Sequence, residues 1–174
     1  MTRPIVLLGL MGSGKTTVGR ALARQLGRTL WDSDAVLEEL TGRTAAQLAD
    51  ERGIEVLHQL EVEVLSRGVS EKPAAVVAAA AAVVLDPRLP TLLGPAWVVW
   101  LRADITGLAA RLRTHGGDHG HRPLLAGDTL GTLREMARVR DPLFAQVAHL
   151  TVDAGRLAPP VLVRRIVAAM PPGV

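Results

Sequence analysis

Short runs of apolar residues alternate along the chain with longer stretches whose apolar positions recur at helical spacing. The short runs predict strands at residues 5–8, 30–31, 74–79, 97–101 and 150–152. The helical spacing predicts helices at residues 15–26, 35–40, 45–52, 55–67, 105–112, 129–147 and 161–169. Strands that alternate with helices are typical of a parallel sheet with crossover helices. We therefore expect an α/β fold, a three-layer α/β/α sandwich around a five-stranded parallel sheet.

One polar stretch interrupts this alternation. The sequence THGGDHGHRPLLAGD, residues 114–128, is rich in glycine and has no periodicity, so it predicts a loop. No internal repeat and no linker composition divides the 174 residues. A chain of this length can bury most of its apolar surface in one core, so we expect a single domain spanning residues 1–174.

The composition narrows the function classes. Hydrophobic residues make up 48% of the chain and charged residues 21%, and cysteine is absent, which excludes disulfides, thiol catalysis and cysteine-bound zinc. No apolar run approaches the ~20 residues of a membrane helix, and no signal peptide is evident, so we expect a cytoplasmic protein without a membrane partner. The net charge is +3, but the arginines are scattered and aromatic residues are nearly missing. This pattern argues against nucleic-acid binding.

The strongest motif follows the first predicted strand. GLMGSGKT, residues 9–16, matches G-x-x-x-x-G-K-[ST], in which glycines let backbone N–H groups surround phosphate oxygens. Lys15 brings a cation to the terminal phosphates, and the Thr16 hydroxyl can ligate Mg²⁺. We expect MgATP or a related purine triphosphate at residues Met11, Gly12, Ser13, Gly14, Lys15, Thr16 and Thr17. Because an N-K-x-D element is lacking, small-metabolite and nucleotide kinases are favoured over switch GTPases.

Two carboxylates follow the second predicted strand in WDSD. In an extended segment Asp32 and Asp34 would point the same way, into the crevice at the carboxyl ends of the strands. One could help hold Mg²⁺ through water, and the other could accept the proton of an attacking hydroxyl. The alternative is that Asp34 merely caps the next helix.

The glycine-rich loop carries Arg122, in HRPLL, which could close over the triphosphate and stabilise the transferring phosphoryl group. The alternative is an ordinary solvated arginine. His115, His119 and His121 lie in the same loop, and we interpret them as solvated side chains rather than metal ligands.

Taken together, GLMGSGKTTVGRALARQLG, WDSDAVLEELTG, GIEVLHQLE, RPLLAG and RDPLF resemble the shikimate kinase family in order and spacing over nearly the whole chain. The resemblance implies a P-loop fold like that of nucleoside monophosphate kinases, with strand order 2-3-1-4-5. It implies substrate-binding helices at about residues 33–67 and a lid at about residues 114–127. The implied reaction moves the γ-phosphate of ATP onto a ring hydroxyl of shikimate.

On the nucleotide side, Lys15 and Thr16 resemble the family's phosphate and Mg²⁺ residues, and Asp32 resembles the carboxylate that holds Mg²⁺ through water. Arg113 and Pro159 resemble the pair that sandwiches adenine. The lid alignment around Arg113 carries a small insertion.

On the acceptor side, Asp34 resembles the carboxylate that binds the reacting hydroxyl. Arg122 resembles the lid arginine, and Arg140 the arginine that binds the substrate carboxylate. Lys15, Asp34 and Arg122 are therefore the expected catalytic residues.

The chain departs from the family pattern at two acceptor positions. The family ends its third strand in three glycines, whereas residues 79–82 here are alanines, so Ala80 and Ala81 would face the substrate with added methyl groups. His58 stands where the family has a substrate-binding arginine. Histidine offers at most one contact to a carboxylate and is mostly neutral near pH 7, whereas arginine offers a charged fork.

These departures leave alternatives open. The acceptor could be shikimate, or a cyclitol or other small alcohol. The chain could also bind nucleotide as a regulator without kinase activity, or act on a nucleoside monophosphate. A small hydroxylated molecule is the expected partner, and a monomer the expected state.

Overall fold

The computed structural model describes residues 2–114 and 128–174 and contains one parallel sheet. Its strands are β1 (Ile5–Leu8), β2 (Leu30–Asp32), β3 (Val76–Ala78), β4 (Trp97–Arg102) and β5 (Leu150–Asp153). They pair in the order β2-β3-β1-β4-β5, and every pair is parallel. The expected sheet and its strand order are confirmed.

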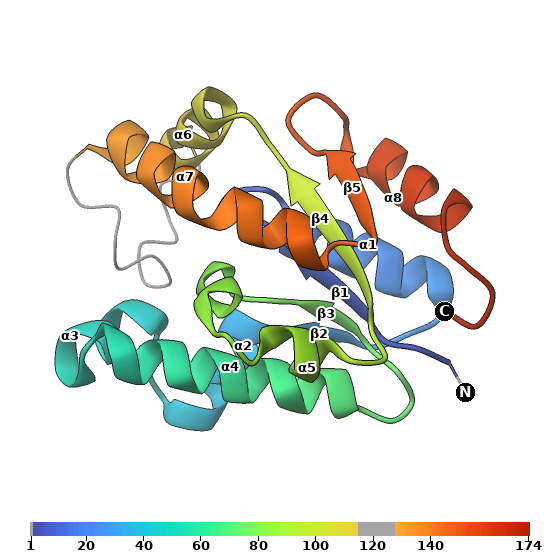
Figure 1. Cartoon of the computed structure of the whole chain (residues 1–174), viewed down its shortest axis with the longest axis horizontal. Helices are drawn as coiled ribbons and strands as arrows, with labels where there is room; N and C mark the ends of the chain where they lie inside the picture. Colours follow the sequence, from blue (N-terminus) through green and yellow to red (C-terminus); the bar gives the residue numbers. More distant parts are fainter. Residues whose placement is uncertain (1, 115–127) are drawn as a thin grey trace.

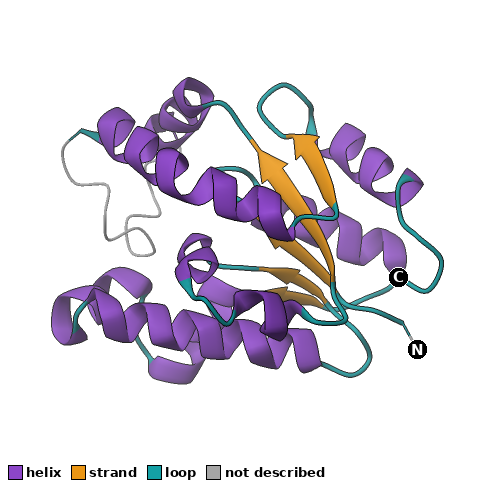
Figure 2. Cartoon of the chain, in the orientation of Figure 1, coloured by secondary structure: helices purple, strands orange, loops and turns teal. Residues whose placement is uncertain are grey.

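Helices cover both faces of this sheet (Figures 1 and 2). They are α1 (Lys15–Leu26), α2 (Ser33–Thr41), α3 (Ala45–Arg52), α4 (Ile54–Ser70), η1 (Ala81–Leu85, a 3₁₀ helix), α5 (Leu89–Leu93), α6 (Ile105–Thr114), α7 (Thr129–Val147) and α8 (Pro159–Ala168). In Figure 1, α4, α5 and α7 lie in front of the sheet, and α1 lies behind it beside α8. The three-layer sandwich is confirmed.

The central strand β1 shows why a short apolar run was sufficient to predict it. All four of its residues are fully buried. Ile5 and Leu7 pack in the core on the side of α1 and α8, whereas Val6 and Leu8 pack in the core on the side of α4 and α7. A strand covered on both faces needs apolar residues at every position, which distinguishes it from a strand with one solvated face.

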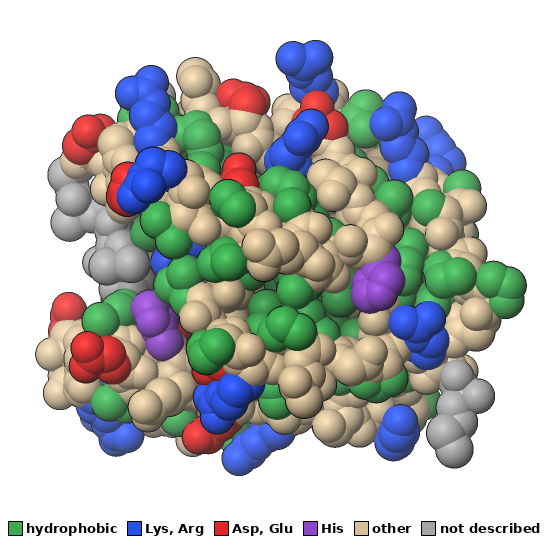
Figure 3. All heavy atoms as spheres, viewed as in Figure 1, with side chains coloured by type: hydrophobic (Ala, Val, Ile, Leu, Met, Phe, Trp, Pro, Cys, Tyr) green, Lys and Arg blue, Asp and Glu red, His purple; other side chains and the backbone are tan. Residues whose placement is uncertain are grey.

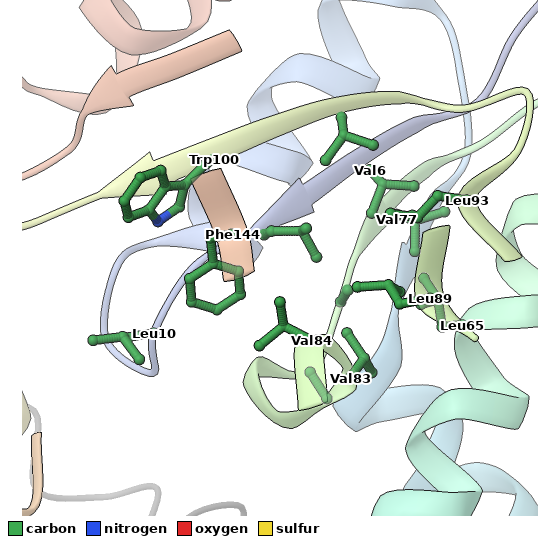
Figure 4. Packing of buried hydrophobic residues seen from close by; sticks show 14 of the residues in the cluster. Val6, Leu10, Leu65, Val77, Val83, Val84, Leu89, Leu93, Trp100 and Phe144 are labelled. Carbon is green, nitrogen blue, oxygen red and sulfur yellow. The ribbon is translucent and has the colours of Figure 1, made fainter. Parts of the chain in front are cut away.

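The core on the front side fixes the chain that leaves β3. Figure 4 shows Val83 and Val84 of η1 pointing into a cluster with Leu89 of α5, near Trp100 and Phe144. The Trp100 and Phe144 rings lie 5.9 Å apart between centroids. Because η1 is anchored in this cluster, the alanines immediately before it are held in a fixed position.

The sequence did not predict η1 or α5. Residues 76–85 are alanine, valine and leucine without a period, so nothing in the pattern separates the end of β3 from the start of η1. Helix α5 has only five residues and contains Pro90, which is too short for helical spacing to be visible. The third strand is accordingly shorter than the expected 74–79, and α2 and α8 each begin two residues earlier than expected.

Helices α2, α3 and α4 form a small core of their own, in which Leu37, Leu48 and Leu57 are almost fully buried. These helices span the region where substrate-binding helices are expected. The expected lid lies almost entirely in residues 115–127, outside the described residues.

Within residues 2–114 and 128–174, no helix is long and apolar enough to cross a membrane. On the face seen in Figure 3, Lys and Arg side chains are spread along several edges rather than gathered in one patch.

Candidate functional site

The loops that follow β1, β2 and β3 meet over the carboxyl ends of these strands and border a cavity of about 720 Å³. In open parallel sheets this edge is where ligands bind, next to the point at which the strand order reverses. The cavity is lined by Met11, Gly12, Ser13, Gly14, Lys15, Thr16, Thr17, Val18, Asp32, Asp34, Ile54, Leu57, His58, Glu61, Ala78, Ala79, Ala80, Ala81, Ala82, Arg111, Leu112, Arg140, Ala154, Leu157, Pro159 and Leu162.

The loop after β1 has the geometry of a phosphate cradle. Gly14 caps α1 with a φ of 92°, a conformation that favours glycine, and a β-carbon on Gly9 would lie 2.6 Å from the Leu101 carbonyl oxygen. The Lys15 ammonium group donates to the carbonyl oxygens of Gly9 (2.9 Å) and Leu10 (3.1 Å). The Ser13 hydroxyl is buried without a hydrogen-bond partner among the described residues. The phosphates of ATP fit this loop, because it offers the positive N-terminal end of α1, the Lys15 ammonium group and the Ser13 hydroxyl.

The two aspartates reach the cavity by a different route from the one expected. Asp32 is the last residue of β2 and the N-cap of α2, where its Oδ1 accepts a hydrogen bond from the Asp34 backbone N–H (3.2 Å). Asp34 lies in the first turn of α2, so the two carboxylates do not share an extended segment. The helix cap is Asp32 rather than Asp34, which leaves the Asp34 carboxylate lining the cavity.

The oxygen ligands present fit Mg²⁺. Thr16 and Asp32 both line the cavity beside the phosphate cradle. Among the described residues no group of three or more His, Cys, Asp and Glu side chains could hold a metal ion. Mg²⁺ usually takes one or two protein oxygens together with substrate phosphates and water, so a hydroxyl and a carboxylate are a suitable donor set.

The opposite side of the cavity is built by α4, α7 and the segment after β3. On α4, Ile54, Leu57, His58 and Glu61 recur at helical spacing, so one stripe of the helix faces the cavity. Arg140 reaches the same cavity from α7 and is only 6% exposed. A buried guanidinium in a cavity is suited to a carboxylate ligand.

The alanines form an apolar wall without backbone strain. Ala80 has φ −60° and ψ 147°, and no described residue other than glycine has a positive φ. The backbone after β3 therefore takes a path that any residue can adopt, and residues 78–82 line the cavity.

His58 is an uncharged neighbour of Arg140. Burial lowers the pKa of His58 below its usual 6.5, the Arg140 charge lowers it further, and Glu55 partly offsets both. The imidazole is accordingly neutral at pH 7, as expected from the sequence.

Glu61 is a cavity residue that sequence reasoning missed. Its side chain is 7% exposed, and its Oε2 has no hydrogen-bond partner among the described residues. Burial and the Asp34 charge raise the pKa of Glu61 from 4.5 to about 8, against the opposing charges of Arg140 and Lys15. The available signal was the spacing from Leu57 to Glu61, which places the carboxyl on the apolar stripe of α4.

This burial predicts an effect on stability. The unfolded chain loses the Glu61 proton above pH 4.5 while the folded chain keeps it up to about pH 8, so stability falls as pH rises between these values. Gln at position 61 cannot ionise, so we expect Glu61→Gln to raise the free energy of unfolding at pH 7 by on the order of 3 kcal/mol, with a smaller gain at pH 5. Urea denaturation at both pH values measures this. An equal effect at pH 5 and pH 7 would contradict it.

At the other end of the cavity, Arg111 connects three segments. Its guanidinium donates to the carbonyl oxygens of Ala154 (2.9 Å), Gly155 (3.1 Å) and Gly12 (3.4 Å). Leu112, Leu157, Pro159 and Leu162 add apolar surface here, as a nucleotide base requires. The expected Pro159 lies in this region, and Arg111 was not anticipated. The side chain of Arg113 and the whole of Arg122 lie outside the described part of the chain.

The comparisons with known proteins point to one family. A family model described as shikimate kinase matches residues 11–171. The chain is 40% identical to a shikimate kinase of Symbiobacterium thermophilum over 153 residues, 87% of each chain. It is 35% identical to a shikimate kinase of Mycobacterium avium over 98% of its own length and 95% of that protein.

Solved structures give the same result. Shikimate kinase from Acinetobacter baumannii in complex with shikimate matches with a TM-score of 0.87 and 34% identity, covering 96% of this chain and 92% of that one. A gluconokinase from Sinorhizobium meliloti shares the fold, with a TM-score of 0.61 and 19% identity over 95% of this chain and 90% of that one.

Proposed function

Because this chain belongs to the shikimate kinase family, we propose that it transfers the γ-phosphate of ATP to a ring hydroxyl of shikimate. Membership in this family makes the chain an ATP-dependent phosphotransferase with an alcohol acceptor. The observation that carries the proposal is that the cradle residue Lys15, the carboxylate of Asp34 and the guanidinium of Arg140 line one cavity. In the proposal, these three residues supply the cation that holds the phosphates, the base and the anchor for the acceptor.

In the proposed reaction the acceptor oxygen attacks the γ-phosphorus in line with the β–γ bridging oxygen. The new bond forms between these two atoms, the bond from phosphorus to the bridging oxygen breaks, and ADP leaves. Asp34 orients the hydroxyl and accepts its proton, and Lys15 stabilises the charge of the transferring group. Arg122, from the expected lid, would add a second cation there.

When bound, Mg²⁺ would be held by Thr16 and Asp32 and would neutralise charge on the β- and γ-phosphates. This assignment rests on the donor types that line the phosphate end of the cavity.

Arg140 is proposed to hold the acceptor carboxylate. It is a buried cation on the acceptor side of the cavity, and the surrounding apolar wall strengthens a charge-assisted hydrogen bond by excluding water. His58, being neutral, contributes at most one hydrogen bond.

The proposal predicts magnesium-dependent turnover of shikimate. We expect purified protein to release ADP and form a phosphorylated shikimate, with lower kcat/KM for quinate and for cyclitols, which lack either the same ring or the carboxylate that Arg140 binds. Coupled ADP assays and mass spectrometry of the product measure this, with Lys15→Ala as the inactive control. Turnover of another alcohol without turnover of shikimate would overturn the proposed acceptor.

A further inference from the structure

The buried carboxyl of Glu61 has no role in the reaction described so far. It lies on α4 one turn after His58, on the stripe that faces the cavity, and is 7% exposed. Its Oε2 is buried and has no partner among the described residues. Leaving a buried polar atom without a hydrogen bond is costly, so such atoms in a cavity wall usually meet a ligand or ordered water.

Charged groups face Glu61 from three other elements. Asp34 comes from α2, Arg140 from α7 and Lys15 from α1, while His58 on α4 itself is neutral. The alanine side chains that line the cavity have no polar atoms with which to bond a carboxyl group. Burial and the Asp34 charge together outweigh the two cations, and the pKa of Glu61 rises to about 8. At pH 7 Glu61 is therefore mostly a carboxylic acid, which can donate a hydrogen bond.

The charge balance at the acceptor end depends on this proton. With Glu61 protonated, the charges of Asp34, Arg140 and Lys15 around it sum to one net positive charge, which suits an acceptor carboxylate. With Glu61 ionised, that charge is cancelled, and a second carboxylate would meet a like charge in an apolar site.

We propose that Glu61 is an acceptor-binding residue that works only in its protonated form, donating a hydrogen bond to the acceptor carboxylate beside Arg140. Its hydrogen bond compensates for the charged contact that the neutral His58 cannot make. It also makes binding of an anionic acceptor depend on the proton of Glu61. This inference rests on the proposed function, because it needs a carboxylate-bearing acceptor.

Linkage gives the size of the effect. If only the protonated form binds, the apparent Kd for shikimate rises as pH passes through the pKa of Glu61, and it increases about tenfold from pH 7 to pH 9. At pH 9 the Glu61 carboxyl must be protonated again before shikimate binds, so about 0.9 proton is taken up per shikimate bound.

The test is calorimetric titration of the full chain, loaded with MgADP, with shikimate at pH 7 and pH 9. Two buffers of different ionisation enthalpy at pH 9 give the number of protons taken up. In Glu61→Gln, whose amide donates a hydrogen bond at any pH, we expect less than a twofold change in Kd and no proton uptake. Glu63→Gln is the matched control, because Glu63 is exposed on another face of α4 and does not line this cavity.

The outcomes separate the two proposals. The wild-type protein and Glu63→Gln should show the tenfold weakening and the proton uptake, and Glu61→Gln should show neither. Three results would overturn the role of Glu61. They are the same pH dependence in Glu61→Gln as in the wild type, a wild-type Kd that does not change with pH, and tighter wild-type binding at pH 9. Absence of shikimate binding at both pH values would instead overturn the proposed acceptor.

Discussion

Replacing Asp34 with Asn is expected to lower kcat by about 100- to 10,000-fold, the range that a general base contributes. Asp34 is the acidic residue in the first turn of α2 that lines the cavity, and its neighbour Asp32 supplies the helix cap. The asparagine has the same shape but cannot accept the hydroxyl proton. Steady-state kinetics with saturating MgATP measures the loss, and the KM for ATP should change much less than kcat.

The control for this variant is Asp50→Asn, because Asp50 is exposed on α3 and does not line the cavity. It should keep the wild-type kcat. Equal unfolding temperatures of the two variants would show that the loss at position 34 is chemical rather than structural. A kcat within tenfold of wild type in Asp34→Asn would contradict the role given to this carboxylate.

In the pH range where Glu61 stays protonated, replacing His58 with Arg is expected to tighten shikimate binding by about 10- to 100-fold, because a charge-assisted hydrogen bond is worth about 1.5–3 kcal/mol. Among the described residues, the acceptor side of the cavity contains the buried guanidinium of Arg140 and the neutral imidazole of His58, whose pKa is lowered by burial. A second guanidinium lies one turn from Glu61, so it also lowers the pKa of that carboxyl and moves the pH dependence of binding below pH 8. Calorimetric Kd values from pH 6 to pH 9 measure both effects.

His58→Gln is the matched control, since glutamine is polar and uncharged and should leave the Kd for shikimate within a few-fold of wild type. The result that contradicts the account is weaker binding in His58→Arg than in His58→Gln. That outcome would mean that no acceptor carboxylate approaches this part of α4.

The position of the residues expected to bind nucleotide could be predicted from the sequence, because the signals are local. Residues 9–16 carry the loop, the lysine and the start of α1 in one motif, and the adjacency of Asp32 and Asp34 fixes both near the end of β2. Even so, the geometry behind the second signal differed. The helix begins at Ser33, so Asp34 reaches the cavity from a helical turn and not from an extended strand.

The acceptor side of the cavity was harder to predict from the sequence, because the burial and charge of its residues depend on contacts between distant segments. Glu61 looks in the sequence like any charged position on an amphipathic helix, and only its burial in the cavity wall, together with the Asp34 charge, raises its pKa. Similarly, the alanine run has no period, so the sequence did not show where β3 ends and η1 begins. Residues 115–127, which include Arg122, lie outside the described residues, and the role of that arginine stays a prediction.

The central claim is that one cavity holds the triphosphate at Lys15 and an acceptor between Asp34, Glu61 and Arg140. The most direct measurement is a crystal structure of the protein with MgADP and shikimate at pH 7. The account predicts the shikimate carboxylate within hydrogen-bond distance of both Arg140 and Glu61, and a ring hydroxyl at Asp34 facing the phosphates. Shikimate bound with its carboxylate turned away from Arg140, or bound outside this cavity, would contradict it.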